Sequence, residues 1–372
     1  MRSPIKHEVL LVILLGIATL IAGFFTIRQF TPLDSLQWLL IADCLWVFVC
    51  WQLWQRLELN RAHQSAPLYT KLGWANHVTL FRGGLIALTG GFLFQPQAEG
   101  WAGWIPGVLY TLAAILDRMD GFVARRGKQT SLLGSELDTV YDALGLLVAP
   151  LLAVGYGKIH WSFLLVSAAY YVFVWGLYWR RTHNLPVYPL MPSLLRRTLA
   201  GFQMGFVAFI LLPCFYAPLT IIIGIAFMLP ILLGFIVDWL VVSGRIQSSA
   251  TNAKLFNHLA QISHTVFQPL LRLVLFIALL LLIHNDNILL PTFLTVILLV
   301  VATMTLFGLA GRIGALIAVV LVTFSTGDNF VDVITATIIF TGAWLMLLGT
   351  GRFSLWQWDD RWVNRRDGEE HS

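Results

Sequence analysis

Repeated apolar runs about as long as a membrane-spanning helix constrain this chain more than any other feature. Such a helix needs about 20 predominantly apolar residues to cross the hydrocarbon core of a bilayer. The runs do not alternate every second residue, as the strands of a membrane β-barrel would. We therefore expect an all-α polytopic membrane protein. Twelve runs can be read along the 372 residues, at 8–27, 36–54, 77–95, 101–119, 138–156, 161–179, 198–215, 218–240, 267–284, 288–308, 313–325 and 330–349.

Composition excludes the other main classes. Hydrophobic residues make up 58% of the chain and charged residues only 12%, against about 45–50% and about 25% in soluble domains. Too few charges remain to cover a soluble surface, and disorder needs the opposite balance. The three cysteines (Cys44, Cys50 and Cys214) lie in apolar runs without metal-ligand spacing, so we expect neither a zinc site nor a disulfide framework.

The placement of Lys and Arg predicts an orientation. If the N-terminus is cytoplasmic, only Arg28 and Lys158 of the 24 basic residues fall in outside loops. Cytoplasmic loops carry such an excess of basic residues. We therefore expect a multi-pass protein of a bacterial-type inner membrane, with both termini and the active site cytoplasmic. The net charge of +5 is then explained by topology and anionic lipid, without nucleic acid.

Polar interruptions divide the predicted spans into blocks. A polar stretch follows the eighth span, and another polar tail follows the last. We predict five parts: a pair of N-terminal spans at 1–60, a block of six spans at 72–242, a cytoplasmic linker at 243–265, a four-helix membrane module at 266–350 and a cytoplasmic tail at 351–372.

Four aspartates concentrate charge at two neighbouring helix ends. Asp117 and Asp120 are three residues apart, and Asp138 and Asp142 are four apart, so each pair shares a helix face. A short loop joins the two helices, which brings the four carboxylates toward one pocket. Like charges this close need compensation, and Mg²⁺ takes carboxylate oxygens while leaving positions for phosphate. Two such ions could bridge a diphosphate.

The residues between the aspartates favour the same chemistry. Gly121, Ala124 and Gly134 would let a bulky group approach the helices closely. Arg125 offers a planar fork for phosphate. The pattern predicts displacement at a phosphorus of a diphosphate, with one carboxylate taking a proton from the nucleophile. A structural salt-bridge network with the neighbouring basic residues is the alternative, and it leaves the glycines and the spacing unexplained.

The segment reads D-x2-D-G-x2-A-R-x8-G-x3-D-x3-D from Asp117 to Asp142. This pattern resembles the signature of the CDP-alcohol phosphatidyltransferase family. The resemblance implies that the block at 72–242 is a six-helix catalytic core. It also implies the transfer of a phosphate-linked alcohol from a CDP-alcohol to an acceptor hydroxyl with release of CMP, and we expect CDP-diacylglycerol as the donor. It also implies a role in phospholipid biosynthesis and a homodimer.

The same resemblance implies roles for single residues. Three aspartates would bind two Mg²⁺ ions, with Mn²⁺ as a substitute, and Asp142 would be the general base and touch one metal. The implied metal ligands are Asp117, Asp120, Asp138 and Asp142. The implied contacts to the CDP-alcohol are Gly121, Ala124, Arg125, Ser131 and Gly134, together with Asn76, Thr79 and Arg82, which are similar to the N-x-x-T-x-x-R entry of the family's first core helix.

Arg196 and Arg197 precede the fifth predicted core helix, where lipid-making relatives often have an S-x-x-G-K-type sequence. An Arg pair could bind an acceptor phosphate, and positive-inside topology explains the pair equally well. The acceptor stays open among glycerol phosphate, inositol phosphate, an amino alcohol and another polyol.

The last four spans carry no catalytic constellation. Their opening at 270–276 and closing at 347–355 resemble the DoxX-type four-helix membrane proteins, and we interpret them as an accessory module. For the whole chain we expect a membrane phosphotransferase. A transporter that uses the aspartates as a cation or proton path, or a Mg²⁺-dependent polyprenyl transferase, is the alternative.

Overall fold

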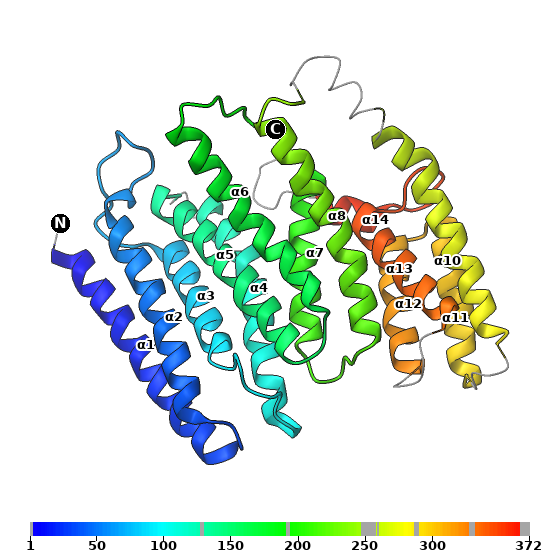
Figure 1. Cartoon of the computed structure of the whole chain (residues 1–372), viewed down its shortest axis with the longest axis horizontal. Coiled ribbons are helices and arrows are strands. Elements are labelled where there is room, and N and C mark those ends of the chain that lie inside the picture. The colour runs from blue at the N-terminus through cyan, green and yellow to red at the C-terminus, as the bar shows by residue number, and fades with distance from the viewer. Residues whose placement is uncertain are drawn as a thin grey trace. The chain divides into compact units, whose positions relative to one another are not determined.

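The computed structural model of the chain is helical throughout the part that it describes (Figure 1). That part covers residues 3–126, 130–190, 194–246, 258, 260–285, 290–326 and 332–364, with the backbone alone at 3–4, 120–126, 194, 326 and 364. The long helices are α1 (Ser3–Phe30), α2 (Ser35–Arg56), α3 (Trp74–Gly90), α4 (Ile105–Arg126), α5 (Leu132–Gly155), α6 (Leu164–Thr182), α7 (Leu194–Ile210), α8 (Leu219–Val242), α10 (Gln268–Ile283), α11 (Thr292–Phe307), α12 (Gly311–Thr326) and α13 (Val333–Leu348). A short helix, α14 (Trp358–Asn364), follows.

Each of the twelve predicted runs coincides with one of these long helices, and the chain is an all-α polytopic membrane protein. Six described segments are long and apolar enough to cross a membrane: α1, α2, α5, α6, α8 and the helical stretch 260–283. The helices α11, α12 and α13 are apolar but have only 16 residues each. The helices α3, α4 and α7 fall outside both sets.

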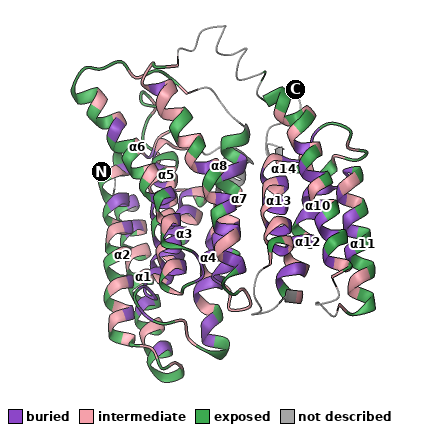
Figure 2. Cartoon of the chain, turned by 45° about the vertical axis from the view of Figure 1, so that its right-hand side comes forward, coloured by how far each residue is buried: buried purple, intermediate pink, exposed green. Residues whose placement is uncertain are grey.

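Large apolar side chains on the outer helices are exposed, as expected of a surface that faces lipid. On α1, Leu10, Leu14 and Phe25 are more than half exposed, and Figure 2 shows exposed positions along α1 and α2. Soluble proteins rarely expose contiguous apolar patches of this size. The exposed apolar faces therefore support the membrane assignment independently of helix length.

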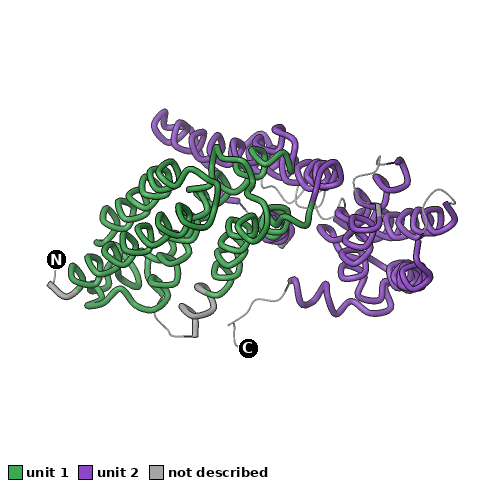
Figure 3. The backbone as a smooth tube through the Cα atoms, turned by 90° about the horizontal axis from the view of Figure 1, so that it is seen from below, with its two compact units in different colours: residues 1–158, 204–215, 366–372 green, residues 159–203, 216–365 purple. Residues whose placement is uncertain are grey.

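The described residues form two compact units, which are coloured separately in Figure 3. The first comprises the described parts of Met1–Lys158 and of Met204–Phe215. The second comprises the described parts of Ile159–Gln203 and of Tyr216–Arg365. The helix α7 contributes to both units. The five-part division made from the sequence stays a prediction.

Glycines and tryptophans bring the first helices of unit 1 together. A Cβ atom on Gly16 or Gly23 of α1 would overlap the indole rings of Trp46 and Trp38 of α2. The other sides of the same two rings meet glycines of α3 and of the turn after it, Gly84 and Gly91. Small residues allow close helix packing in membranes, so α2 is held between α1 and α3.

The helix α5 is anchored against α2 and α4. The hydroxyl of Tyr141, which is completely buried, donates to the carbonyl of Val49 at 3.0 Å. The hydroxyl of Tyr110 on α4 donates to the carbonyl of Gly145 at 3.5 Å. These hydrogen bonds join α5 to α2 and α4, and α5 also packs against α3. The helices α3, α4 and α5 all carry predicted site residues.

Unit 2 contains α6, α8 and the four helices α10–α13. The indole N–H of Trp344 on α13 donates to the carbonyl of Ala226 on α8 at 3.1 Å, and Gly176 of α6 accommodates the ring of Trp239. A core of leucine, valine, alanine and isoleucine fills the α10–α13 bundle. The segment after α13 packs against the helix ends, because Arg272 donates to the carbonyl of Arg352 at 2.8 Å.

Candidate active site

One face of α3 carries three of the predicted site residues. Asn76, Thr79 and Arg82 are spaced by three residues, which puts them on the same side of a helix. All three are buried, and Arg82 is completely so. The helix packs against α4 and α5 on this side, so the Arg82 side chain reaches the residues that those helices present.

Arg82 connects three of the four predicted aspartates. Its Nη1 donates to a carboxylate oxygen of Asp117 on α4 and, at 2.8 Å, to Oδ1 of Asp138 on α5. Its Nη2 donates to Oδ1 of Asp142 at 2.9 Å and to the backbone carbonyl of Asp138 at 3.1 Å. One guanidinium therefore ties α3 to both aspartate-bearing helices. The sequence predicts Arg82 as a contact of the CDP-alcohol and carries no signal for these bonds to the aspartates.

The three carboxylates lie close enough to share a cation. One oxygen from each of Asp117, Asp138 and Asp142 lies within 4.8 Å of the others. Their side chains are 29%, 43% and 36% exposed, whereas that of Arg82 is 1% exposed. The guanidinium thus lies beneath a carboxylate cluster that is partly open to its surroundings.

The three carboxylates are ligands that suit a hard divalent cation. Mg²⁺ prefers carboxylate oxygens, and with all three carboxylates ionised the single guanidinium leaves two negative charges uncompensated. Asp120 lies one turn beyond Asp117 on α4, and its side chain is outside the described residues. The same holds for Gly121, Ala124 and Arg125, whose backbone continues α4.

The start of α5 meets α3 beside this cluster. Ser131 is the N-cap of α5, where its Oγ accepts a hydrogen bond from the N–H of Gly134 at 3.0 Å. The same hydroxyl donates to Oδ1 of Asn76 at 3.2 Å. A Cβ atom on Gly134 would come within 2.7 Å of that oxygen. Gly134 is therefore required by the close approach of Asn76.

Residues 72–234 match the family model described as CDP-alcohol phosphatidyltransferase. Residues 72–234 are similar to the CDP-alcohol phosphatidyltransferases, and for this similarity we call them the phosphatidyltransferase domain. It contains α3–α7 and most of α8. The pair α1–α2 and the bundle α10–α13 lie outside the match, and the DoxX-type resemblance of 266–350 stays a prediction.

The curated relatives of the phosphatidyltransferase domain share one description, CDP-diacylglycerol–glycerol-3-phosphate 3-phosphatidyltransferase. The protein of Cereibacter sphaeroides is 38% identical over 112 residues, which cover 28% of this chain and 50% of the relative. Those of Pectobacterium atrosepticum and Yersinia enterocolitica are 37% and 34% identical over 84 residues, covering 23% of this chain and 45% of each relative. The chain spans about half the length of the curated relatives it matches, and no solved structure matches it.

Two further predicted residues of the phosphatidyltransferase domain belong to unit 2. Nη2 of Arg196 lies 2.7 Å from Oδ1 of Asp238 on α8, so this arginine has an acidic partner within the protein. Arg197 is its neighbour on α7 and is exposed. Their role toward an acceptor stays a prediction.

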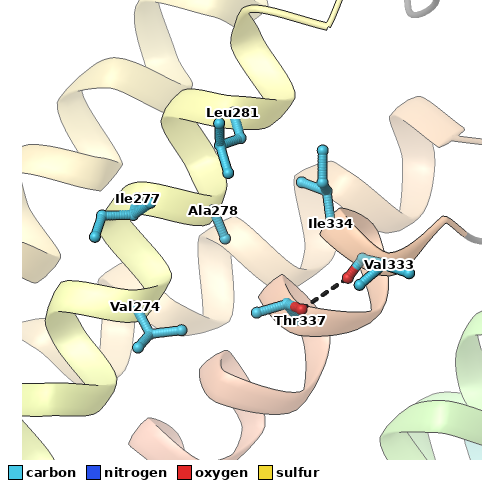
Figure 4. A pocket seen from close by; sticks show the side chains of 7 residues that line it. All are labelled: Val274, Ile277, Ala278, Leu281, Val333, Ile334 and Thr337. Atoms are coloured by element: carbon cyan, nitrogen blue, oxygen red, sulfur yellow. Dashed lines mark hydrogen bonds between the residues drawn. The ribbon is translucent and has the colours of Figure 1, made fainter.

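A pocket in unit 2, outside the phosphatidyltransferase domain, offers no comparable chemistry. It has a volume of about 240 Å³ and lies between α10 and α13 (Figure 4). Its only polar side chain, Thr337, already donates to the carbonyl of Val333 at 2.7 Å. Its lining residues are Val274, Ile277, Ala278, Leu281, Val333, Ile334 and Thr337. Apart from that hydroxyl the wall is hydrocarbon, so the aspartate cluster is the candidate active site.

Proposed function

We propose that this protein transfers the phosphatidyl group of CDP-diacylglycerol to the hydroxyl of an acceptor and releases CMP. The observation that carries the proposal is the convergence of Asp117, Asp138 and Asp142 on Arg82, within a domain of the matching family. A chain with membrane-spanning helices can keep the acyl chains of such a donor in lipid while its headgroup meets these carboxylates.

The carboxylates are proposed to hold two Mg²⁺ ions, which Mn²⁺ could replace, with Asp120 as the fourth ligand. When bound, these ions would neutralise the diphosphate of the donor and the charge that develops on the leaving phosphate. Arg82 orients the carboxylates from the buried side of the cluster, because its guanidinium donates a hydrogen bond to an oxygen of each of the three.

Asp142 is proposed as the general base. Its carboxylate takes the proton of the acceptor hydroxyl, and the oxygen attacks the phosphorus that carries diacylglycerol. The bond from that phosphorus to the bridging oxygen breaks, CMP leaves with the electron pair, and the proton stays on Asp142. Positioning and electrostatic stabilisation supply the acceleration, as at other phosphoryl-transfer sites.

Glycerol 3-phosphate is the acceptor that we propose to test first. The curated relatives carry it in their names, and the role of Arg196 and Arg197 toward an acceptor phosphate stays a prediction from the sequence. In line with the distribution of basic residues, we further propose that both termini and the site face the cytoplasm. A homodimer, implied by the resemblance, stays a prediction.

The test uses the full chain, purified in detergent, with CDP-diacylglycerol, Mg²⁺ and a panel of acceptor alcohols. We expect CMP release that depends on one acceptor, and we expect Asp142→Asn to abolish it. Lipid mass spectrometry of the product identifies the headgroup. No CMP release with any acceptor would refute the proposal. In that case, solute uptake sensitive to Asp142→Asn would favour a transporter, and prenyl diphosphate turnover a polyprenyl transferase.

A further inference from the structure

The connection between α2 and α3 contains a buried asparagine that the family match does not include. Asn60 directly follows a short 3₁₀ helix at Leu57–Leu59 and is completely buried. Its Nδ2 donates to the carbonyl of Lys71 at 2.8 Å, and its own carbonyl accepts from the N–H of Tyr69 at 2.8 Å. The segment 57–71 is thus closed into a compact loop around this side chain.

Asn60 also reaches a predicted contact of the CDP-alcohol. Its Oδ1 accepts a hydrogen bond from Nδ2 of Asn76 at 3.3 Å. The other hydrogen of that nitrogen goes to the carbonyl of Leu72 at 2.6 Å. Both amide hydrogens of Asn76 are then engaged, which fixes the plane of its side chain and turns Oδ1 toward Ser131.

The resulting chain of hydrogen bonds runs from the loop to the start of α5. Asn60 is linked to Asn76, Asn76 to Ser131, and Ser131 to the N–H of Gly134. Each of the last three residues is a predicted contact of the donor. Asn60 is the one member that lies outside the matched residues 72–234.

Further contacts hold the loop in the same place. The carbonyl of Arg61 accepts from the N–H of Leu132 at 2.9 Å, which ties the loop to the first turn of α5. On the other side, a carboxylate oxygen of Glu8 on α1 accepts from the N–H of Leu72 at 2.9 Å. The loop is therefore supported both by α5 and by the N-terminal helix.

We propose that Asn60 is a positioning residue for the donor, acting through Asn76. By fixing the amide of Asn76, it holds the Asn76–Ser131–Gly134 group in the geometry that binds the CDP part of a CDP-alcohol. The loop that follows α2 is then part of the donor site. This inference rests on the proposed function, together with the family resemblance that makes Asn76, Ser131 and Gly134 donor contacts.

The test compares Asn60→Ala with Gln95→Ala in the full-length protein. Gln95 is a matched control, since it is also a buried amide and joins the turn after α3 to Asp34, the N-cap of α2. Its Oε1 accepts from the N–H of Asp34 at 2.9 Å, and its Nε2 donates to the carbonyl of Asp34 at 3.2 Å. Both substitutions should lower the unfolding temperature, because both remove buried hydrogen bonds.

Only Asn60→Ala should weaken donor binding. Loss of one orienting hydrogen bond corresponds to a rise of about three- to tenfold in KM for CDP-diacylglycerol and in Kd for CDP. We expect kcat to stay within about twofold of wild type, and Gln95→Ala to leave KM and Kd unchanged. Equal KM and Kd in the two variants would overturn the proposal, since a purely structural role predicts that result.

A double-mutant cycle tests the route through Asn76. In an Asn76→Ala background, Asn60→Ala should change Kd for CDP by less than about twofold, because coupled residues are not additive. Independent, multiplicative effects would overturn the proposal.

Calorimetric titration with CDP and Mg²⁺ also separates the role of Asn60 from the proposed phosphatidyl transfer. If wild-type protein binds CDP but releases no CMP, the proposed reaction is refuted, and the effect of Asn60→Ala on Kd for CDP can still be measured. If wild-type protein does not bind CDP, both proposals are refuted.

Discussion

Replacing Arg82 by methionine removes the one guanidinium that binds Asp117, Asp138 and Asp142. The substitution keeps much of the side-chain volume and deletes the charge. Two carboxylate oxygens that lie within 4.8 Å of each other repel each other by at least about 3.5 kcal/mol at an effective dielectric constant of about 20. Three such pairs arise, but each carboxylate is 29–43% exposed, so solvent and protonation relieve much of the repulsion.

We therefore expect Arg82→Met to lower the free energy of unfolding by about 3 kcal/mol, the lower end of the range for breaking a buried ion pair. Without divalent cations this cost should appear in full. With Mg²⁺ it should shrink, because an ion that binds only the folded cluster stabilises it by mass action. CMP release should fall by at least about 10²-fold, since even a small misplacement of catalytic groups costs that much.

The assay is unfolding in detergent with Mg²⁺ or with EDTA, alongside Arg56→Met as a control. Arg56 lies in the same unit, donates to Gln52 and is 3.9 Å from Glu136, with a side chain 26% exposed. An exposed pair of this kind contributes at most about 1 kcal/mol. If Arg82→Met were as stable as Arg56→Met in EDTA, or equally unstable in EDTA and Mg²⁺, the reasoning about the charge cluster would be refuted.

Three further predictions concern the neighbourhood of the site and its support. Gly134→Ala should raise Kd for CDP about tenfold in calorimetric titration, because its Cβ would lie 2.7 Å from Oδ1 of Asn76; an unchanged Kd would contradict this. Tyr141→Phe should cost about 1 kcal/mol in unfolding experiments with CDP binding retained, since it removes the 3.0 Å bond to a carbonyl of α2. Burial lowers the pKa of Lys158, which donates to two backbone carbonyls, to about 8. The unfolded chain then holds more protons than the folded one between pH 8 and about 10.4, so the unfolding temperature of wild type relative to Lys158→Met should rise with pH across that window, and a fall would contradict the assignment.

The sequence could predict the helices because apolar runs report them directly. All twelve runs coincide with long helices. Two of the three helices that carry the site, α3 and α4, are nevertheless not among the segments that length and hydropathy alone identify as spans. The aspartate cluster could also be predicted, because Asp138 and Asp142 share a face by their spacing and Asp117 lies across a short loop. Local periodicity carries that information.

The contacts of Arg82 and Asn60 could not be predicted in this way. Arg82 is separated from Asp117 by 35 residues and from Asp142 by 60, and its spacing from Asn76 says only that both share one face of α3. Asn60 lies in a polar connection where every side chain could be solvated. Its burial depends on how the loop 57–71 folds back, which is a property of tertiary packing and leaves no periodic signal.

The burial gradient across the site explains why an arginine is suited to the position of Arg82. A lysine could lose its proton in a buried setting, whereas a guanidinium stays charged and presents several donors in a fixed plane. Here the guanidinium of Arg82 pairs with two carboxylates on α5 and one on α4, while the Arg82 side chain is 1% exposed. The guanidinium therefore holds the three carboxylates, which are 29–43% exposed, in one arrangement before any cation arrives. A cation and a diphosphate would then bind to a prearranged cluster, which reduces the reorganisation that phosphoryl transfer would otherwise require.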